Sequence, residues 1–347
     1  MSAPLQESIQ TPEELDALLS RPGPALVRAI RGFRSPLVIV GAGGKIGPTL
    51  AVMARRAAAE AGYALEVVAV SRFSHTAPAR FWLEGHGVRT LSCDVLQPES
   101  LRQLPEAENV IHLVGQKFGT GKSPSATWAV NVAAAAQVAE RYARSRLIAL
   151  STGNVYPLSE VAKKGSVETD PLTPLGEYAN STVGRERVLE YFSERDETPL
   201  ALLRLCYAVE LRYGVLLDIA QKVHVGKPID LANGFFNCIW QGDANDMILR
   251  SLALAQCPST VWNLCRPEVF SLREVAGQFG ELLERPPQFV GSENATALLC
   301  NSRPLCDALG EPPTPLRPML RWIADWVRRG GTTWGKPTGL EVRDGRY

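Results

Sequence analysis

The chain has 347 residues, of which 45% are hydrophobic and 21% are charged, and this length allows one or two globular domains. Its 37 Lys and Arg nearly balance its 36 Asp and Glu, so the net charge of +1 provides no basic surface for nucleic acid or an anionic membrane. No stretch approaches the ~20 apolar residues of a membrane span, and the first forty residues lack a signal-peptide pattern. Seven cysteines without a CxxC pair predict reduced thiols. We therefore expect a cytoplasmic protein with a small-molecule ligand and no nucleic-acid or membrane partner.

Strand-like and helix-like segments alternate along the chain. Residues 1–34 are expected to form a helical extension, because Thr11-Pro12-Glu13-Glu14 is a helix-start signal. Short apolar runs predict strands at 37–40, 65–70, 88–91, 110–114, 147–150 and 202–206, with helices at 48–61, 126–142, 271–283 and 320–328. This alternation predicts an α/β fold, a Rossmann-like doubly wound parallel sheet covered on both faces. We place the dinucleotide-binding domain at 35–205 and a smaller, mainly substrate-binding region with a C-terminal helix at 206–347.

A glycine-rich segment, Gly41-Ala42-Gly43-Gly44-Lys45-Ile46-Gly47, follows the first predicted strand and precedes a helix. In that context, glycines let the backbone turn sharply and approach a pyrophosphate, whose charge sits on the amides of the next helix. We expect Gly41, Gly44 and Gly47 to shape this site, with Lys45 and Ile46 between them. The alternative is a plain glycine-rich turn.

The end of the second predicted strand bears on the choice of cofactor. NAD-binding domains usually place an acidic residue there to hold the ribose diol, whereas this chain has Ser71 and Arg72. A guanidinium binds a 2′-phosphate that a carboxylate would repel, so we prefer NADP over NAD. If Arg72 is only a solvated surface charge, NAD remains open.

Several motifs in the same order give the chain a resemblance to the NAD-dependent epimerase/dehydratase family, the extended short-chain dehydrogenases, over about residues 36–330. These are Leu91-Ser92-Cys93-Asp94-Val95, Val110-Ile111-His112-Leu113-Val114-Gly115, Trp128-Ala129-Val130-Asn131-Val132, Leu150-Ser151-Thr152-Gly153-Asn154-Val155-Tyr156 and Glu177-Tyr178-Ala179-Asn180-Ser181-Thr182. The resemblance implies that Asp94 and Val95 face the adenine and that Val114 and Gly115 flank the cofactor. It also implies that Asn131 supports the active site, that Thr152 binds the reacting oxygen, and that Tyr178 is the acid/base next to the cofactor.

One position departs from the resembled pattern. The family has Tyr-x-x-x-Lys, but Thr182 stands four residues after Tyr178, and no tyrosine of the chain has lysine at that spacing. A neighbouring cation lowers a tyrosine pKa by ~1–3 units, so its loss handicaps oxidation, which needs a base, more than reduction. We therefore expect either that the enzyme reduces a carbonyl or that another cation acts, with Lys117 and Lys122 as candidates. Both lysines are equally well explained as solvated loop residues.

The first hypothesis is an NADP- or NAD-dependent oxidoreductase or epimerase acting on a sugar, sugar acid or related polyhydroxylated carbonyl compound. The second is a dinucleotide-binding sensor or partner subunit with impaired catalysis, which Thr182 favours. The four histidines show no metal spacing, so we predict no metal, and we interpret His112 as a buried imidazole with satisfied hydrogen bonds. Arg212 is interpreted either as a contact to an anionic substrate group or as part of a structural ion pair. The resemblance further implies a homodimer formed by the helices near 126–142 and 178–194.

Overall fold

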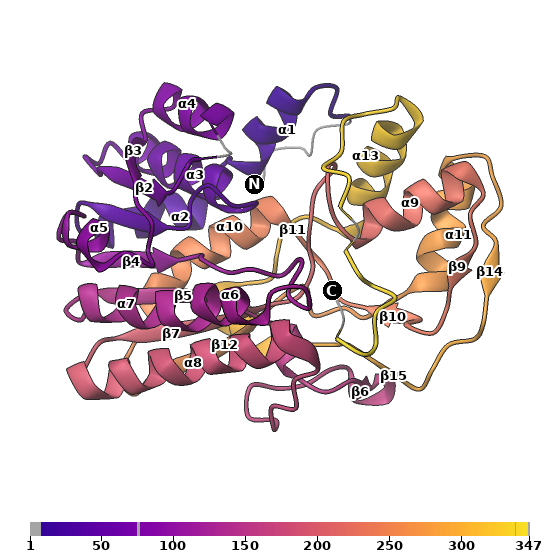
Figure 1. Ribbon diagram of the computed structural model, residues 1–347. Coiled ribbons are helices and arrows are strands. Elements are labelled where there is room, and N and C mark those ends of the chain that lie inside the picture. Colours follow the sequence, from indigo (N-terminus) through magenta and orange to yellow (C-terminus); the bar gives the residue numbers. More distant parts are fainter. Residues whose placement is uncertain (1–7, 75–76, 337, 346–347) are drawn as a thin grey trace.

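The computed structural model describes residues 8–74, 77–336 and 338–345 (Figure 1). A seven-stranded sheet in the order β12-β7-β5-β4-β1-β2-β3 forms its centre, and every neighbouring pair of strands is parallel. The strands are β1 (Leu37–Val40), β2 (Val67–Ser71), β3 (Arg89–Ser92), β4 (Asn109–His112), β5 (Arg146–Thr152), β7 (Leu200–Leu205) and β12 (Thr260–Leu264). The predicted Rossmann-like α/β fold is confirmed.

Alternating residues of these strands enter two different cores, as expected for strands buried on both faces. Leu37 and Ile39 pack on one face with α3 (Gly47–Glu60) and α10 (Gln241–Arg250). Val38 and Val40 pack on the other face with α7 (Ala134–Arg141) and α8 (Gly176–Asp196). Figure 1 shows α7 and α8 side by side along the lower face of the sheet. The fold thereby brings the carboxyl ends of β1, β4 and β5 to one edge, beside the start of α8.

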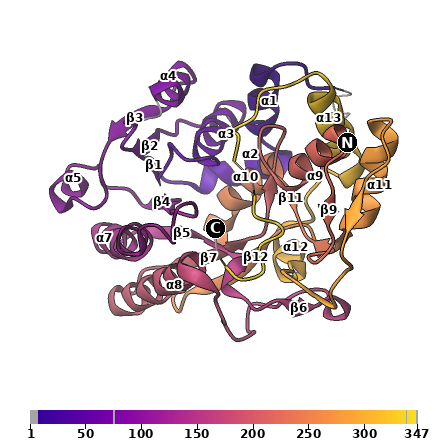
Figure 2. The same ribbon diagram turned by 45° about the vertical axis from the view of Figure 1, so that its right-hand side comes forward.

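A separate helical body with its own core stands beside the sheet (Figure 2). It contains α9 (Val215–Val225), α11 (Leu272–Leu282) and α13 (Leu316–Arg328), joined by α1 (Pro12–Leu19) from the N-terminal segment. Trp322 of α13 is buried against Trp240, with ring centroids 5.2 Å apart, so the tryptophan-rich helix serves core packing. Because Leu15 and Leu19 also enter this core, the N-terminal helix is an integral part of the body.

The predicted helix over 126–142 is interrupted. The structure has α6 (Pro124–Trp128), a π-helical turn at Ala129–Ala133 and then α7. Such wide turns often occur at functional sites, because they re-aim one side chain, and here the turn contains Asn131.

The shorter elements complete the chain. They are α2 (Pro24–Ala29), α4 (Ala77–Gly85), α5 (Pro98–Arg102), α12 (Arg303–Leu309), β6 (Ser159–Glu160), β8 (Ala208–Val209), β9 (Ile229–Asp230), β10 (Phe235–Phe236), β11 (Ile239–Trp240), β13 (Phe270–Ser271), β14 (Phe289–Val290), β15 (Thr296–Ala297) and the 3-10 turns Ile30–Gly32, Gly153–Val155, Val161–Lys163 and Ser251–Leu254. Residues 1–7 of the predicted extension and His75 lie outside the described residues. In the part that is described, no helix combines the length and apolarity needed to cross a membrane.

The cysteines correct one expectation. Cys206 and Cys300 are joined as a disulfide across 94 residues of sequence, so the prediction that all seven thiols are reduced is wrong for this pair. Both sulfur atoms lie against Gly153, where a Cβ atom would collide with them. The pair therefore packs directly beneath the turn that follows Thr152.

Candidate active site

The glycine segment forms a tight turn between β1 and α3. Gly41 has φ +89°, and a Cβ there would lie 2.7 Å from the backbone nitrogen of Val114. A Cβ at Gly47 would overlap the backbone of Ala42. At Gly44 the nearest atom would be the Gly41 carbonyl oxygen at 3.4 Å, an ordinary contact. The fold itself thus requires two of the three glycines, while Gly44 leaves a surface open to a ligand.

This turn lines a cavity of about 250 Å³ that we call the loop cavity. Its lining includes Gly41, Gly44, Lys45, Ile46, Gly47, Gly115, Tyr178 and Arg185. The N-terminus of α3, a helix of 14 residues, opens onto the same turn, and the amides of such an end favour an anion. Bare backbone, open space beside Gly44 and the helix end together fit the pyrophosphate of a dinucleotide.

The residues predicted at the adenine end lie at the ends of β2 and β3. Ser71 closes β2, and Arg72 follows it with an exposed side chain. The carboxylate of Asp94 accepts a hydrogen bond from the Leu96 amide (3.0 Å), which shapes the turn after β3, and Val95 packs against the adjoining core. Ser71 and Ser92 are paired in the sheet, so these segments share one edge.

Asn131 ties the loop after β4 to the helix that carries Tyr178. Its side-chain oxygen accepts from the Gln116 amide (2.7 Å), and its side-chain nitrogen donates to the Gln116 carbonyl (3.1 Å) and to the Ser181 hydroxyl (2.8 Å). Asn131 is buried. Its hydrogen bonds therefore hold the backbone next to Val114 and Gly115 in place.

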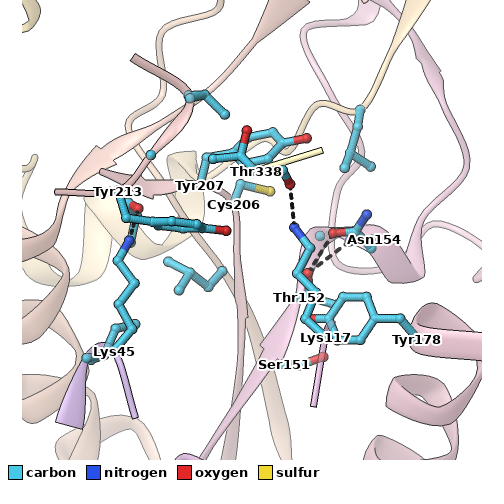
Figure 3. A pocket seen from close by; sticks show the side chains of 17 residues that line it. Lys45, Lys117, Ser151, Thr152, Asn154, Tyr178, Cys206, Tyr207, Tyr213 and Thr338 are labelled. Carbon is cyan, nitrogen blue, oxygen red and sulfur yellow. Dashed lines mark hydrogen bonds between the residues drawn. The ribbon is translucent and has the colours of Figure 1, made fainter. Parts of the chain in front are cut away.

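A second cavity of about 140 Å³, which we call the inner cavity, holds the predicted reaction centre (Figure 3). Tyr178, Thr152, Lys45, Lys117 and Tyr213 line it, and Tyr178, Lys45 and Lys117 also line the loop cavity. The Thr152 hydroxyl donates to Oδ1 of Asn154 (2.9 Å). Tyr207, another lining residue, has φ +39°, a left-handed backbone uncommon for a non-glycine residue and often found at functional sites. The structure thus brings the predicted acid/base and hydroxyl to one cavity that adjoins the glycine turn.

Two lysine ammonium groups reach into this region. Lys45 donates to the carbonyl of Ala208 (2.5 Å) and lies 4.4 Å from the centre of the Tyr213 ring, and burial lowers its pKa to about 7. Lys117 donates to the carbonyl of Thr338 (2.9 Å), and burial lowers its pKa to about 8. Figure 3 shows Lys45 pointing from the glycine turn toward Tyr213. Lys122, the other candidate cation, is exposed and lines neither cavity.

The position of the missing lysine is filled without a cation. Thr182 is buried, and its hydroxyl donates to the backbone carbonyl of Tyr178 (2.9 Å). One turn further along α8, the Arg185 guanidinium enters the loop cavity and donates to the Val114 carbonyl (2.8 Å). Arg185 is not among the residues predicted from the sequence, although its spacing of seven residues from Tyr178 places both on one face of the helix.

Contacts decide the interpretation of two further residues. Arg212 forms ion pairs with Asp16 (2.7 Å) and Glu210 (3.1 Å), so its role here is structural. Buried His112 has no hydrogen-bond partner for either ring nitrogen among the described residues, so the predicted satisfied imidazole is wrong. Burial, and then the charge of Arg185, lowers the pKa of His112 to about 3. Across the described ranges, no group of three His, Cys, Asp or Glu side chains is arranged to hold a metal ion.

This sheet, the glycine turn and the ordered motifs define an enzyme of the extended short-chain dehydrogenase type. Residues 37–234 match the model of the NAD dependent epimerase/dehydratase family, and the chain belongs to this family. No curated protein matches the sequence significantly.

Solved structures of similar fold include two UDP-glucose 4-epimerases. The enzyme from Thermotoga maritima is 16% identical, with a TM-score of 0.68, 85% of this chain and 99% of that chain covered. The enzyme from Thermus thermophilus in complex with NAD is 18% identical, with a TM-score of 0.68 and coverage of 84% and 99%. DesIV, a dTDP-glucose 4,6-dehydratase from Streptomyces venezuelae with NAD bound, is 17% identical, with a TM-score of 0.69 and coverage of 85% and 97%. At these identities the similarity establishes a shared fold alone.

Proposed function

We propose that this protein is an NAD(P)-dependent oxidoreductase or epimerase acting on a sugar, a sugar acid or a related polyhydroxylated carbonyl compound. The observation that carries the proposal is the adjoining pair of cavities, in which Tyr178 and Thr152 lie next to the bare glycine turn. The similar epimerases and the dehydratase, whose names specify sugar nucleotides, support the substrate class.

In this proposal different elements of the chain bind different parts of the cofactor. Gly41, Gly44 and Gly47, with the backbone of Lys45 and Ile46, hold the pyrophosphate. At the adenine end are Ser71, Arg72, Asp94 and Val95. Val114 and Gly115 flank the opposite end, which Asn131 supports. The bound nicotinamide supplies the hydride exchange.

The remaining chemistry is acid/base work by the protein. The hydroxyl of Tyr178 gives a proton to the substrate oxygen during reduction, and in the oxidising direction its phenolate takes the proton from the substrate hydroxyl. Thr152 donates a hydrogen bond to the same oxygen and so fixes its position. Lys117, one of the two lysines considered from the sequence, lines both cavities with Tyr178, and its ammonium donates to the carbonyl of Thr338 (2.9 Å).

The test is a screen of sugars and sugar acids with NAD and NADP in both directions, followed through the absorbance of the reduced nicotinamide. We expect turnover that Tyr178→Phe abolishes while the melting temperature stays nearly unchanged. Saturating cofactor should raise the melting temperature, because a specific ligand stabilises the state that it binds. Absence of that rise for both cofactors would overturn the proposal.

A second candidate function is a dinucleotide-binding sensor or partner subunit, favoured by the threonine at position 182. Such a protein binds cofactor and shows neither absorbance change nor isotope exchange with any substrate of the screen. The same two measurements therefore separate the candidates.

We also propose NADP as the preferred cofactor. Arg72 is exposed at the end of β2, where its guanidinium can meet a 2′-phosphate. Arg72→Ala should weaken NADPH binding about tenfold or more and change NADH binding little, because one charge-assisted contact is lost. An equal effect on both dissociation constants would contradict the preference.

Finally, we propose a homodimer formed through α7 and α8. Exposed Trp128 and Tyr191, at 41% and 59%, lie on α6 and α8 and support a contact there. Sedimentation equilibrium tests this directly.

A further inference from the structure

We propose that Arg185 takes over the cofactor-binding role of the missing active-site lysine: its guanidinium binds the nicotinamide-ribose end of the cofactor, beside Tyr178. This inference rests on the proposed function. It assigns a role to a residue that no motif of the family singles out.

The geometry of α8 explains how a residue at position +7 can replace one at +4. At ~100° per residue, Thr182 lies ~40° to one side of Tyr178 around the helix axis, and Arg185 lies ~20° to the other side. Arg185 is about 10.5 Å further along the axis, compared with about 6 Å for Thr182. Helical side chains lean toward the N-terminus, so a long arginine reaches back toward Tyr178. Arg185 therefore shares the face of Tyr178.

The surroundings place the guanidinium in the cofactor site. It lines the loop cavity with Gly41, Gly47 and Tyr178. Its Nη1 lies 2.8 Å from the point where Gly115 would carry a Cβ, so the absence of a side chain there makes room for it. The carbonyl that it contacts belongs to Val114, which flanks the cofactor in the proposed arrangement.

The charge of Arg185 is only partly satisfied inside the protein. The residue is 5% exposed, and its Nε has no hydrogen-bond partner among the described residues. Burial lowers its pKa, while Tyr178 and Glu186 oppose that effect. A buried cation is costly unless it is paired and hydrogen-bonded. Arg185 also lines the loop cavity, and an acceptor group of a ligand bound there would complete the pairing of this buried guanidinium.

The carboxylate of the next residue along α8 does not accept a hydrogen bond from the Nε of Arg185. Glu186 is committed to a buried bidentate pair with Arg204 at 2.7 and 3.1 Å, and it also accepts from the Ser151 hydroxyl. The two consecutive residues therefore divide their functions. Glu186 holds β5 and β7 together, and Arg185 is left for the cavity.

The first experiment measures binding and needs no turnover. Dissociation constants of NADH, NADPH and ADP are determined for the unaltered protein, Arg185→Gln, Arg185→Lys and the control Arg187→Gln. Arg187 is on the same helix, but it is exposed and pairs with Glu190 (2.7 Å). We expect Arg185→Gln to weaken the reduced dinucleotides about tenfold or more and ADP, which lacks the nicotinamide ribose, less than about twofold. Arg185→Lys should retain part of the affinity.

The second experiment tests whether a cation at the family's lysine position restores the site. Adding Thr182→Lys to Arg185→Gln should recover the affinity for NADH and NADPH and leave the affinity for ADP unchanged. A merely structural arginine would alter the melting temperature of Arg185→Gln without this selective recovery.

The outcomes are separable. If the unaltered protein binds neither dinucleotide, the proposed function fails and this inference fails with it. If it binds both, but Arg185→Gln weakens NADH and ADP equally or behaves like Arg187→Gln, the inference alone is overturned. Arg185→Lys decides the question if the glutamine variant does not fold, because weaker binding of NADH alone supports the inference and equal weakening of NADH and ADP overturns it.

Discussion

Tyr178 and Thr182 occupy successive turns of α8, and the threonine hydroxyl donates to the tyrosine carbonyl over 2.9 Å. That contact is local to the helix and does not direct a polar group at the cavity. The lysine of the family is thus replaced by a side chain whose hydrogen bond is made within its own helix.

Thr182→Val tests this reading. Valine keeps the shape and removes only a hydroxyl bonded to a carbonyl that the helix already satisfies, so we expect a change in unfolding free energy below about 1 kcal/mol and unchanged kcat. Thermal denaturation and steady-state kinetics measure the two quantities. A large loss of kcat with intact folding would show that the hydroxyl acts in the reaction.

Gly44→Ala and Gly47→Ala should affect different properties, cofactor binding in the first case and the stability of the unliganded protein in the second. The first adds a methyl group with ordinary contacts, so the melting temperature without ligand should stay nearly constant while stabilisation by cofactor is lost. That stabilisation reaches about 2.7 kcal/mol at a ligand concentration of about 100 Kd. Gly47→Ala should destabilise the protein even without ligand, because the methyl group meets the backbone of Ala42. Equal effects of the two substitutions would contradict the distinction.

Lys45 should make the stability of the protein depend on pH. Its pKa is about 7 in the folded state, against 10.5 for an unperturbed lysine, so between these values the unfolded chain binds the extra proton. Stability therefore rises with pH across this window, by less than about 1.4 kcal/mol per unit. Lys45→Met should be more stable than the unaltered protein near the lower end of this window, and the difference should shrink toward the upper end. Urea denaturation at several pH values measures this, and a constant difference would refute it.

The buried pair of Glu186 and Arg204 predicts a strong effect on stability. Glu186→Ala leaves an uncompensated guanidinium in the core and should cost about 3–5 kcal/mol. Changing both residues, as in Glu186→Leu with Arg204→Met, should recover much of the loss because no buried charge remains. Calorimetric melting of both variants and the unaltered protein checks this order. A double variant as unstable as Glu186→Ala would show that the pair itself is indispensable.

The local parts of the fold follow from the sequence. The run Leu37–Val40 matches β1 at both ends, and the strands predicted at 147–150 and 202–206 overlap β5 and β7. Buried parallel strands have continuous apolar runs in the sequence, and glycines mark the turn after the first strand. The strands and this turn can therefore be predicted from the sequence. The same signals predicted the family, whose motifs keep their order along the chain.

Relationships between distant segments required the tertiary structure. The disulfide of Cys206 and Cys300, the ion pairs of Arg212 and the direction of Lys45 depend on which loops meet above the sheet. The placement of Arg185 depends on the phase of α8 and on the missing side chain of Gly115, which belongs to another element. The sequence alone determined six of the seven sheet strands, the glycine turn and the absence of the lysine at position 182, because these are properties of neighbouring residues, whereas the edge strand β12 was not predicted. The presence of Arg185 beside Lys45 and Lys117 in the loop cavity was decided by packing, because these residues are far apart along the chain.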